Sequence, residues 1–160
     1  MTKTNAARIL DNLNVNYELI EYEVDEADLS ATSVAVKLGQ NIDQVFKTLV
    51  LKGDKTGYLV CVIPGGEELD LKKAARVSEN KNVAMIPMKD ILDVTGYIRG
   101  GCSPLGMKKR YPTYIDESCI LYDFIYVSAG IRGLQIKIAP DDLVSAAACE
   151  VADLVLIAGL

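Results

Sequence analysis

Residues 45–65 read VFKTLVLKGDKTGYLVCVIPG, and this stretch decides the kind of fold. It contains two apolar runs rich in β-branched residues, joined by the short polar segment DKT. This pattern is typical of a hairpin or of two adjacent strands in one sheet. A second pair of runs, DFIYVSAG at 123–130 and GLQIKIAP at 133–140, lies around the segment IRG. The sequence therefore predicts a sheet whose strands come in pairs.

The segments around these pairs predict short helices. Capping residues and breakers mark helices at 4–14 behind Thr4 and Asn5, at 30–38 between Ser30 and Gly39, after Asp70, after Pro87, and from Pro140 to about Cys149. YELIEYEV at 17–24 alternates like a half-buried strand, and VAMIP at 83–87 is a short apolar run. Because strands and helices do not alternate regularly, we expect one α+β domain spanning residues 1–160, with a mixed, mostly antiparallel, barrel-like sheet surrounded by helices.

Composition limits both partners and chemistry. The 160 residues carry 17 basic and 22 acidic side chains, a formal charge of −5, which argues against a generic, charge-driven attraction to nucleic acid, DNA included, or to anionic membranes. A polyanionic partner would need a local basic patch. No apolar run approaches the roughly 18 residues of a membrane span, so we expect a cytoplasmic protein. The chain has no histidine, and its four cysteines are widely scattered. We therefore expect no metal site, no cofactor and no imidazole-dependent catalysis.

The irregular segment GYIRGGCSPLGMKKRYP at 96–112 predicts a long structured loop. Gly100 and Gly101 have no side chains, so their amides can approach a ligand closely and stabilise an oxyanion, while Ser103 and Pro104 fix the turn that follows. A plain Gly-Pro connection is the alternative. Cys102 is the obvious candidate nucleophile in this loop, but no histidine can deprotonate it, and we interpret it as structural.

Other candidate residues are polar side chains in apolar surroundings and basic clusters. Lys47 lies at the start of an apolar strand, where partial burial would strengthen its effect on a carbonyl or phosphate; the alternative is a solvated lysine. Tyr22 is either a sheet aromatic or a hydroxyl lining a cleft. Two basic clusters are candidate phosphate contacts, although short runs of cations are more often a solvated face: Lys72, Lys73 and Arg76, and Lys108, Lys109 and Arg110.

Four motifs in this order and spacing are specific, and they span nearly the whole chain: DQVFKTLVL at 43–51, LDLKKAA at 69–75, TGYIRGGCSPLGMKKRYPTYID at 95–116 and IYVSAGIRGLQI at 125–136. In these motifs the chain resembles the YbaK/EbsC family of Cys-tRNA(Pro) deacylases, relatives of the editing domain in bacterial prolyl-tRNA synthetases. The resemblance implies a mixed-sheet domain that acts in trans and hydrolyses the ester between a mischarged amino acid and the terminal adenosine of tRNA(Pro). It also makes prolyl-tRNA synthetase an expected docking partner.

The same resemblance implies roles for individual residues. Lys47 occupies the signature lysine position of the family, and Tyr22 falls where the family has a cleft tyrosine. Gly100 and Gly101 match paired glycines whose amides face the scissile carbonyl, and Ser128 matches a position that lines the pocket. In the mechanism proposed for cysteine-specific members, the thiol of the substrate attacks its own ester, so the protein needs no histidine.

Gln135 is a departure from the family, because some of its members carry an aspartate at this position. Glutamine cannot ionise, so it cannot act as a base, but it can hydrogen-bond the substrate. This departure leaves two alternatives open. The chain could remove alanine or another small residue, or it could be a non-catalytic module that binds tRNA or a synthetase.

Overall fold

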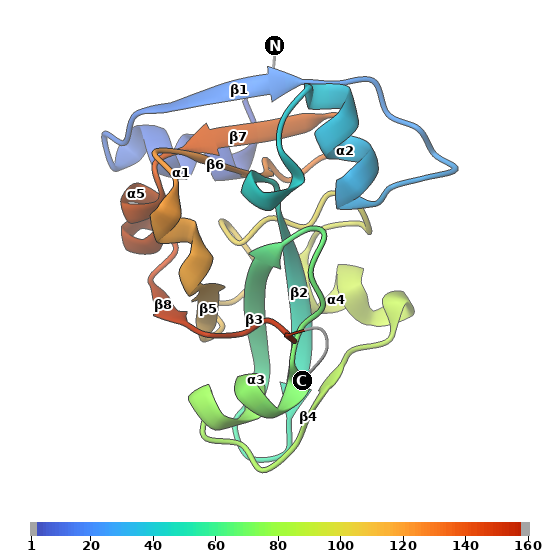
Figure 1. Cartoon of the computed structure of the whole chain (residues 1–160), viewed down its shortest axis with the longest axis vertical. Helices are drawn as coiled ribbons and strands as arrows, with labels where there is room; N and C mark the ends of the chain where they lie inside the picture. The colour runs from blue at the N-terminus through green and yellow to red at the C-terminus, as the bar shows by residue number, and fades with distance from the viewer. Residues whose placement is uncertain (1–2, 158–160) are drawn as a thin grey trace.

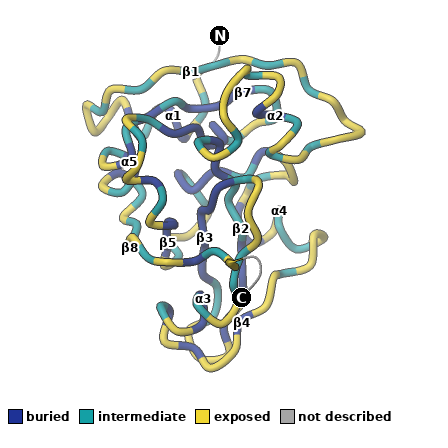
Figure 2. Tube along the Cα trace, viewed as in Figure 1, coloured by how far each residue is buried: buried dark blue, intermediate teal, exposed yellow. Residues whose placement is uncertain are grey.

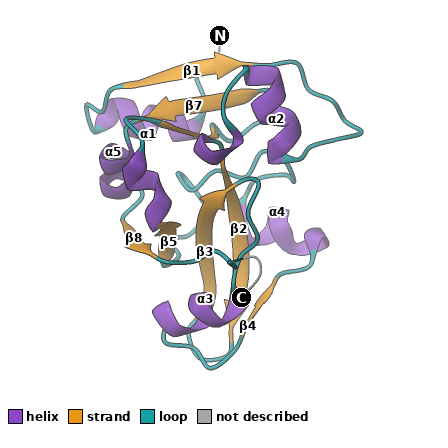
Figure 3. Cartoon of the chain, viewed as in Figure 1, coloured by secondary structure: helices purple, strands orange, loops and turns teal. Residues whose placement is uncertain are grey.

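The computed structural model describes residues 3–157 (Figures 1 and 3). The α-helices of these residues are α1 (Asn5–Asn12), α2 (Ala31–Leu38), α3 (Leu71–Val77), α4 (Ile91–Thr95) and α5 (Pro140–Ala146), and the 3-10 helices are η1 (Ile42–Gln44), η2 (Met88–Asp90) and η3 (Glu117–Leu121). The strands are β1 (Tyr17–Glu21), β2 (Phe46–Gly53), β3 (Gly57–Pro64), β4 (Val83–Met85), β5 (Thr113–Asp116), β6 (Ile125–Ser128), β7 (Leu134–Ile138) and β8 (Cys149–Ala152).

The strands form two sheets. The smaller sheet has the order β1-β7-β6 and is antiparallel throughout, and the larger has the order β4-β2-β3-β5-β8. In the larger sheet β3, β5 and β8 run parallel, whereas β2 is antiparallel to both of its neighbours. A parallel bridge between Val45 and Tyr126 connects the two sheets just before β2 begins. The start of β2 therefore lies beside β6, an edge strand of the smaller sheet.

Helices pack on the apolar faces of the two sheets. Leu10 of α1 and Leu143 of α5 are fully buried with Ile136 and other apolar residues on one face of the smaller sheet. Val34 of α2 packs with Tyr126 on its other face. At the far end of the β2–β3 hairpin, α3 buries Ala74 against the larger sheet (Figures 1 and 2). None of the described helices is long and apolar enough to cross a bilayer.

The α+β class and the paired strands predicted from the sequence are confirmed. The sheet does not close into a barrel; the chain forms two sheets instead. The predicted end of the last helix is wrong: α5 stops at Ala146, Ala148 adopts a left-handed φ of 52°, and Cys149 begins an edge strand. A residue with this φ cannot continue a right-handed helix, which explains the early end.

Candidate active site

A cavity of about 340 Å³ lies where α2, the start of β2, the 96–112 loop and the β6–β7 hairpin meet. It brings together four of the site residues predicted from the sequence: Lys47, Gly100, Ser128 and Gln135. These residues come from segments far apart in the chain, so the fold alone brings them into one cavity. This arrangement is the candidate active site.

Lys47 is the half-buried cation of this cavity, whereas Arg99, which also lines it, is exposed. The side chain is half-buried on β2, where Lys47 follows the buried residue Phe46 and pairs with Ile63 of β3. Burial lowers the pKa of Lys47, while the nearby carboxylates of Glu68 and Glu67 oppose this shift. Within residues 3–157 no hydrogen bond or ion pair to the ammonium is recorded. An unpartnered, half-buried ammonium of this kind is suited to bind an oxygen of a substrate.

Gln135 and Ser128 form the polar floor of the cavity. They are direct partners in the β6–β7 register, so their side chains lie side by side on one face of the sheet. Gln135 is only 5% exposed, and its Oε1 has no hydrogen-bond partner among the described residues. Burying an amide oxygen without a hydrogen-bond partner costs desolvation free energy. A donor from a ligand would offset this cost at Oε1. The Ser128 Oγ accepts a bond from the Gly130 amide at 3.1 Å and keeps its own proton free to donate.

In the glycine loop, residues 96–112, only one of the two predicted oxyanion donors has no hydrogen-bond partner among residues 3–157. Gly100 lines the cavity with a positive φ of 83°, a conformation that favours glycine. The Gly101 amide instead donates to the Ile98 carbonyl at 3.0 Å and closes a turn. A single amide cannot serve two acceptors well, so this turn bond competes with the oxyanion role predicted for Gly101. Gly100 is the remaining candidate donor.

Cys102 also lines the cavity, but burial raises the pKa of its thiol to about 11. The thiol is therefore neutral near pH 7, a poor nucleophile, in agreement with its interpretation as a structural residue. The loop around it is fixed by Tyr97, whose hydroxyl donates to the Leu105 carbonyl, and by Tyr111, whose hydroxyl donates to the Val94 carbonyl at 2.7 Å.

Two predicted substrate contacts do not line the cavity. Ser103 is fully buried, and its Oγ accepts a bond from the Leu105 amide at 3.3 Å, so it stabilises a turn. Tyr22 packs with Val34 and Val45 in the cluster beneath α2. Val34 and Val45 of this cluster line the cavity, whereas Tyr22 does not.

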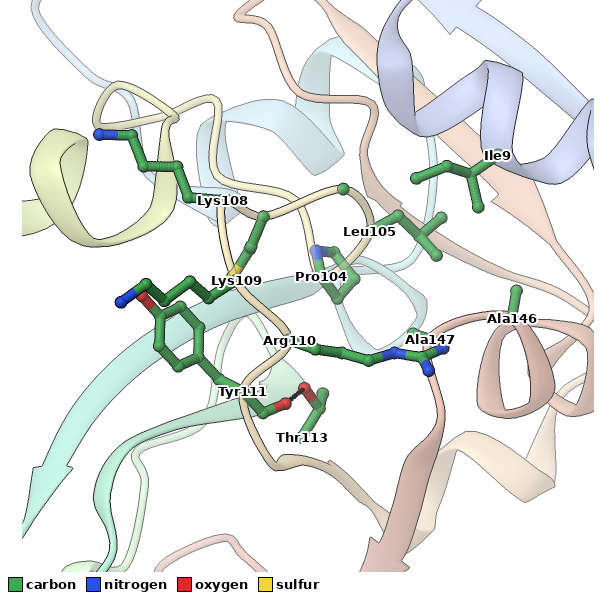
Figure 4. A pocket seen from close by; sticks show the side chains of 12 residues that line it. Ile9, Pro104, Leu105, Lys108, Lys109, Arg110, Tyr111, Thr113, Ala146 and Ala147 are labelled. Atoms are coloured by element: carbon green, nitrogen blue, oxygen red, sulfur yellow. Dashed lines mark hydrogen bonds between the residues drawn. The ribbon is translucent and has the colours of Figure 1, made fainter.

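The basic cluster 108–110 borders a second cavity, of about 220 Å³, on the other part of the same loop (Figure 4). Its three cations do not converge. Lys108 and Lys109 extend to one side, where Lys108 Nζ donates to the Asp93 carbonyl at 3.2 Å, whereas Arg110 extends toward Ala147 near the end of α5. All three are exposed. This arrangement suits separate contacts along an extended polyanion better than one enclosed anion.

The other basic cluster lies on α3, at the opposite end of β2 from Lys47 (Figure 1). Lys73 is engaged within the protein, because its Nζ contacts Asp153 at 3.0 Å and the Val155 carbonyl at 2.8 Å. Lys72 and Arg76 are exposed. The structure therefore does not bring this cluster to the cavity.

Sequence analysis missed the wall that α2 contributes. Leu29, Ala31 and Val34 line the cavity, and the N-terminus of α2, capped by the Ser30 side chain, faces the same region. The capping pattern predicted the helix but not its position against the sheet. The α2 N-terminus adds positive potential to that of Lys47 and Arg99, which favours a substrate carrying phosphates. Among the residues described, no three histidine, cysteine, aspartate or glutamate side chains gather to hold a metal ion.

Comparisons with known proteins identify relatives of the chain. The chain is 53% identical to EbsC of Enterococcus faecalis, named as a proposed Cys-tRNA(Pro)/Cys-tRNA(Cys) deacylase, over 89% of this chain and 87% of the relative. It is 25% identical to the uncharacterised protein YwhH of Bacillus subtilis over 77% of this chain and 80% of that protein.

Solved structures show the same fold. The crystal structure of a proposed trans-editing enzyme for prolyl-tRNA synthetase matches with a TM-score of 0.83 at 24% identity, covering 98% of this chain and 100% of that one. The hypothetical protein APE2540 matches with a TM-score of 0.85 at 20% identity, covering 93% and 97%. Residues 26–146, which contain the whole cavity, match the family described as the aminoacyl-tRNA editing domain, and the chain belongs to that family.

Proposed function

We propose that the chain is an aminoacyl-tRNA deacylase that acts in trans on mischarged Cys-tRNA(Pro). The observation that carries this proposal is the cavity in which an unpartnered Lys47 ammonium, the Gly100 amide and the orphaned Gln135 Oε1 lie together. Membership of the editing-domain family and the 53% identity to EbsC support the substrate class. Prolyl-tRNA synthetase is the proposed docking partner, because the negative net charge gives the chain little general attraction to tRNA.

The reaction needs no nucleophile from the protein. The thiol of the esterified cysteine attacks its own carbonyl carbon, a C–S bond forms, and the C–O bond to the terminal ribose breaks. The thiol proton ends on the ribose oxygen, and the amino acid leaves as a cyclic thiolactone. The protein contributes orientation and stabilisation of the negative charge that develops on the carbonyl oxygen.

Each cavity residue has a part in this scheme. Lys47 binds an oxygen of the aminoacyl ester or of its ribose, and the Gly100 amide donates to the developing oxyanion. The Gln135 Oε1 accepts a hydrogen bond from the α-ammonium of the amino acid, and Ser128 donates beside it. Because Gln135 is neutral, this contact selects by hydrogen bonding and not by charge.

The decisive experiment compares deacylation by the parent, Lys47→Ala and Lys52→Ala on tRNAs charged with cysteine, alanine and serine. Lys52 lies on the same strand but is exposed and lies over the Tyr58 ring, so it controls for the loss of one positive charge. We expect Lys47→Ala to lower kcat/KM on Cys-tRNA(Pro) by roughly 100-fold, the scale of one lost transition-state contact, and Lys52→Ala to stay close to the parent.

Other outcomes would favour the alternatives. Faster turnover of alanyl- or seryl-tRNA than of Cys-tRNA(Pro) would make the chain a deacylase for another amino acid, in which water replaces the thiol. An absence of turnover on every charged tRNA, together with retained tRNA binding, would favour a binding module. Parent-like activity of Lys47→Ala would refute the site.

A further inference from the structure

Arg132, in the turn between β6 and β7, connects three loops around the mouth of the cavity. Its Nε donates to the Arg99 carbonyl at 2.8 Å, and its Nη1 contacts the Glu26 carboxylate at 2.7 Å. Arg99 belongs to the glycine loop, and Glu26 belongs to the segment that leads into α2. The side chain is 27% exposed and does not line the cavity itself. Arg132 therefore acts on the cavity only through the loops that it holds.

The bond to Arg99 fixes the orientation of the peptide that joins Arg99 to Gly100. This peptide is trans, so its C=O and N–H point in opposite directions. With the Arg99 oxygen turned toward Arg132, the Gly100 N–H is turned away from it. No hydrogen bond from this amide is recorded within residues 3–157. Gly100 lines the cavity, whereas Arg132 does not.

Close packing around the two glycines makes the same arrangement rigid. A Cβ added at Gly100 would lie 3.2 Å from Arg132 Nε, and a Cβ added at Gly101 would lie 3.2 Å from the Ile131 Cα. The glycine loop therefore sits directly on the 131–132 backbone. A side chain at either position would crowd this contact, and the positive φ of Gly100 favours glycine.

We propose that Arg132 is a positioning residue that holds the Arg99–Gly100 peptide with its N–H toward the developing oxyanion. This inference rests on the proposed deacylase function. If the peptide rotated, it would present the Arg99 carbonyl oxygen to the oxyanion, and attraction would become repulsion. The Nε bond stabilises the catalytic orientation, and the ion pair of Nη1 with Glu26 is a separate, exposed contact that this role does not require.

Three variants separate these two contacts. Arg132→Lys keeps the charge but has a single nitrogen, which cannot bind Arg99 and Glu26 with the geometry of a guanidinium. Arg132→Ala removes both contacts. Glu26→Gln is the matched control, because it removes the ion pair and leaves the bond between Nε and the Arg99 carbonyl. We expect both Arg132 variants to lower kcat on Cys-tRNA(Pro) about tenfold or more with KM within about twofold, and Glu26→Gln to stay within about twofold in both.

A merely structural role would give a different pattern. Three results would indicate such a role: an equal loss of kcat in Arg132→Lys and Glu26→Gln, an effect on KM alone, or a parent-like kcat in Arg132→Lys. Any one of them would overturn the proposal. The amide resonance of Gly100, followed by NMR, provides a readout that does not need turnover. We expect it to shift in Arg132→Lys and to stay in place in Glu26→Gln.

This second readout separates the two proposals. An inactive parent would refute the deacylase function, and the Gly100 resonance would still test whether Arg132 sets the peptide. An active parent whose Gly100 resonance and kcat are unaffected by Arg132→Lys would refute the positioning role alone.

Discussion

Lys47 shows how a single residue acquires its chemistry from its surroundings. Other lysines of this chain are exposed or engaged, as Lys73 is with Asp153. Burial disfavours the charged form of Lys47 and lowers its pKa, whereas Glu68 and Glu67 favour the charged form. The ammonium is the form that can bind a substrate oxygen. Activity should therefore fall as the pH rises through the lowered pKa of Lys47.

This dependence predicts the effect of Glu68→Gln. Glu68 raises the pKa of Lys47, so removing its charge lowers that pKa further. We expect the alkaline limb of the kcat/KM profile to move to lower pH, with little change at neutral pH. The profile is measured on Cys-tRNA(Pro), and the thiol of the substrate contributes equally to parent and variant. Glu117→Gln, an exposed carboxylate on η3, serves as the control and should leave the limb in place. A shift to higher pH would contradict the assignment of this limb to Lys47.

At the scale of an element, the β2–β3 hairpin depends on one buried side chain. Asn80 Oδ1 accepts bonds from the Lys55 and Thr56 amides at 2.9 and 3.0 Å, and its Nδ2 donates to Thr56 Oγ1 at 2.8 Å. Its amide group packs against Gly53, where an added Cβ would lie 2.3 Å from Nδ2. Asn80 thus binds the turn of the hairpin to the end of α3.

We expect Asn80→Ala to destabilise the fold by about 2 kcal/mol, because two part-buried backbone donors and the Thr56 hydroxyl lose their bonds to a buried side chain. For a chain of this size the melting temperature should fall by roughly 4–8 °C. Thermal unfolding followed by circular dichroism measures the change. Asn12→Ala, at an exposed position on α1, should alter stability by less than about 0.5 kcal/mol. Equal melting temperatures for the two variants would contradict the role of Asn80.

Elements with local signals could be predicted from the sequence. Ser30 and Asp70 cap α2 and α3 with their side chains, and Gly39 ends α2 at a φ of 66°. Each of these signals depends only on residues within one or two turns, so they are visible without the fold. β5 and β8 were not predicted, because both are short and gain their stability from parallel pairing with distant strands. Such pairing leaves little trace in the local pattern.

The candidate site was predicted in part for the same reason. Lys47, Gly100, Ser128 and Gln135 belong to motifs that the family resemblance identifies, and the structure brings all four to one cavity. The engagement of the Gly101 amide in a turn could not be foreseen from the motif. Nor could the contact of Arg132 with Glu26, which are 106 positions apart in sequence. Roles that depend on contacts between residues so far apart in the sequence become visible only in the folded chain.

For the molecule as a whole, the distribution of charge decides how tRNA can approach. The net charge is −5, so attraction must come from local cations. Lys108 and Lys109 extend from the loop that also lines the active-site cavity, whereas α3 lies at the far end of the β2–β3 hairpin (Figures 1 and 4). We therefore expect an acceptor stem whose terminal ester enters the cavity to contact the first cluster and not the second.

Lys109→Ala and Lys72→Ala therefore form a matched pair, since each removes one exposed lysine and changes the net charge equally. We expect Lys109→Ala to weaken binding of tRNA(Pro) and to reduce the slope of log Kd against log salt concentration by about 0.7–0.9, the value for one lost phosphate contact. Lys72→Ala should leave the slope within error of the parent. Titrations between about 50 and 200 mM salt, a range over which phosphate contacts are strongly screened, measure both. A larger change in Lys72→Ala would place the tRNA along α3 and would reverse the docking orientation that the position of the cavity favours.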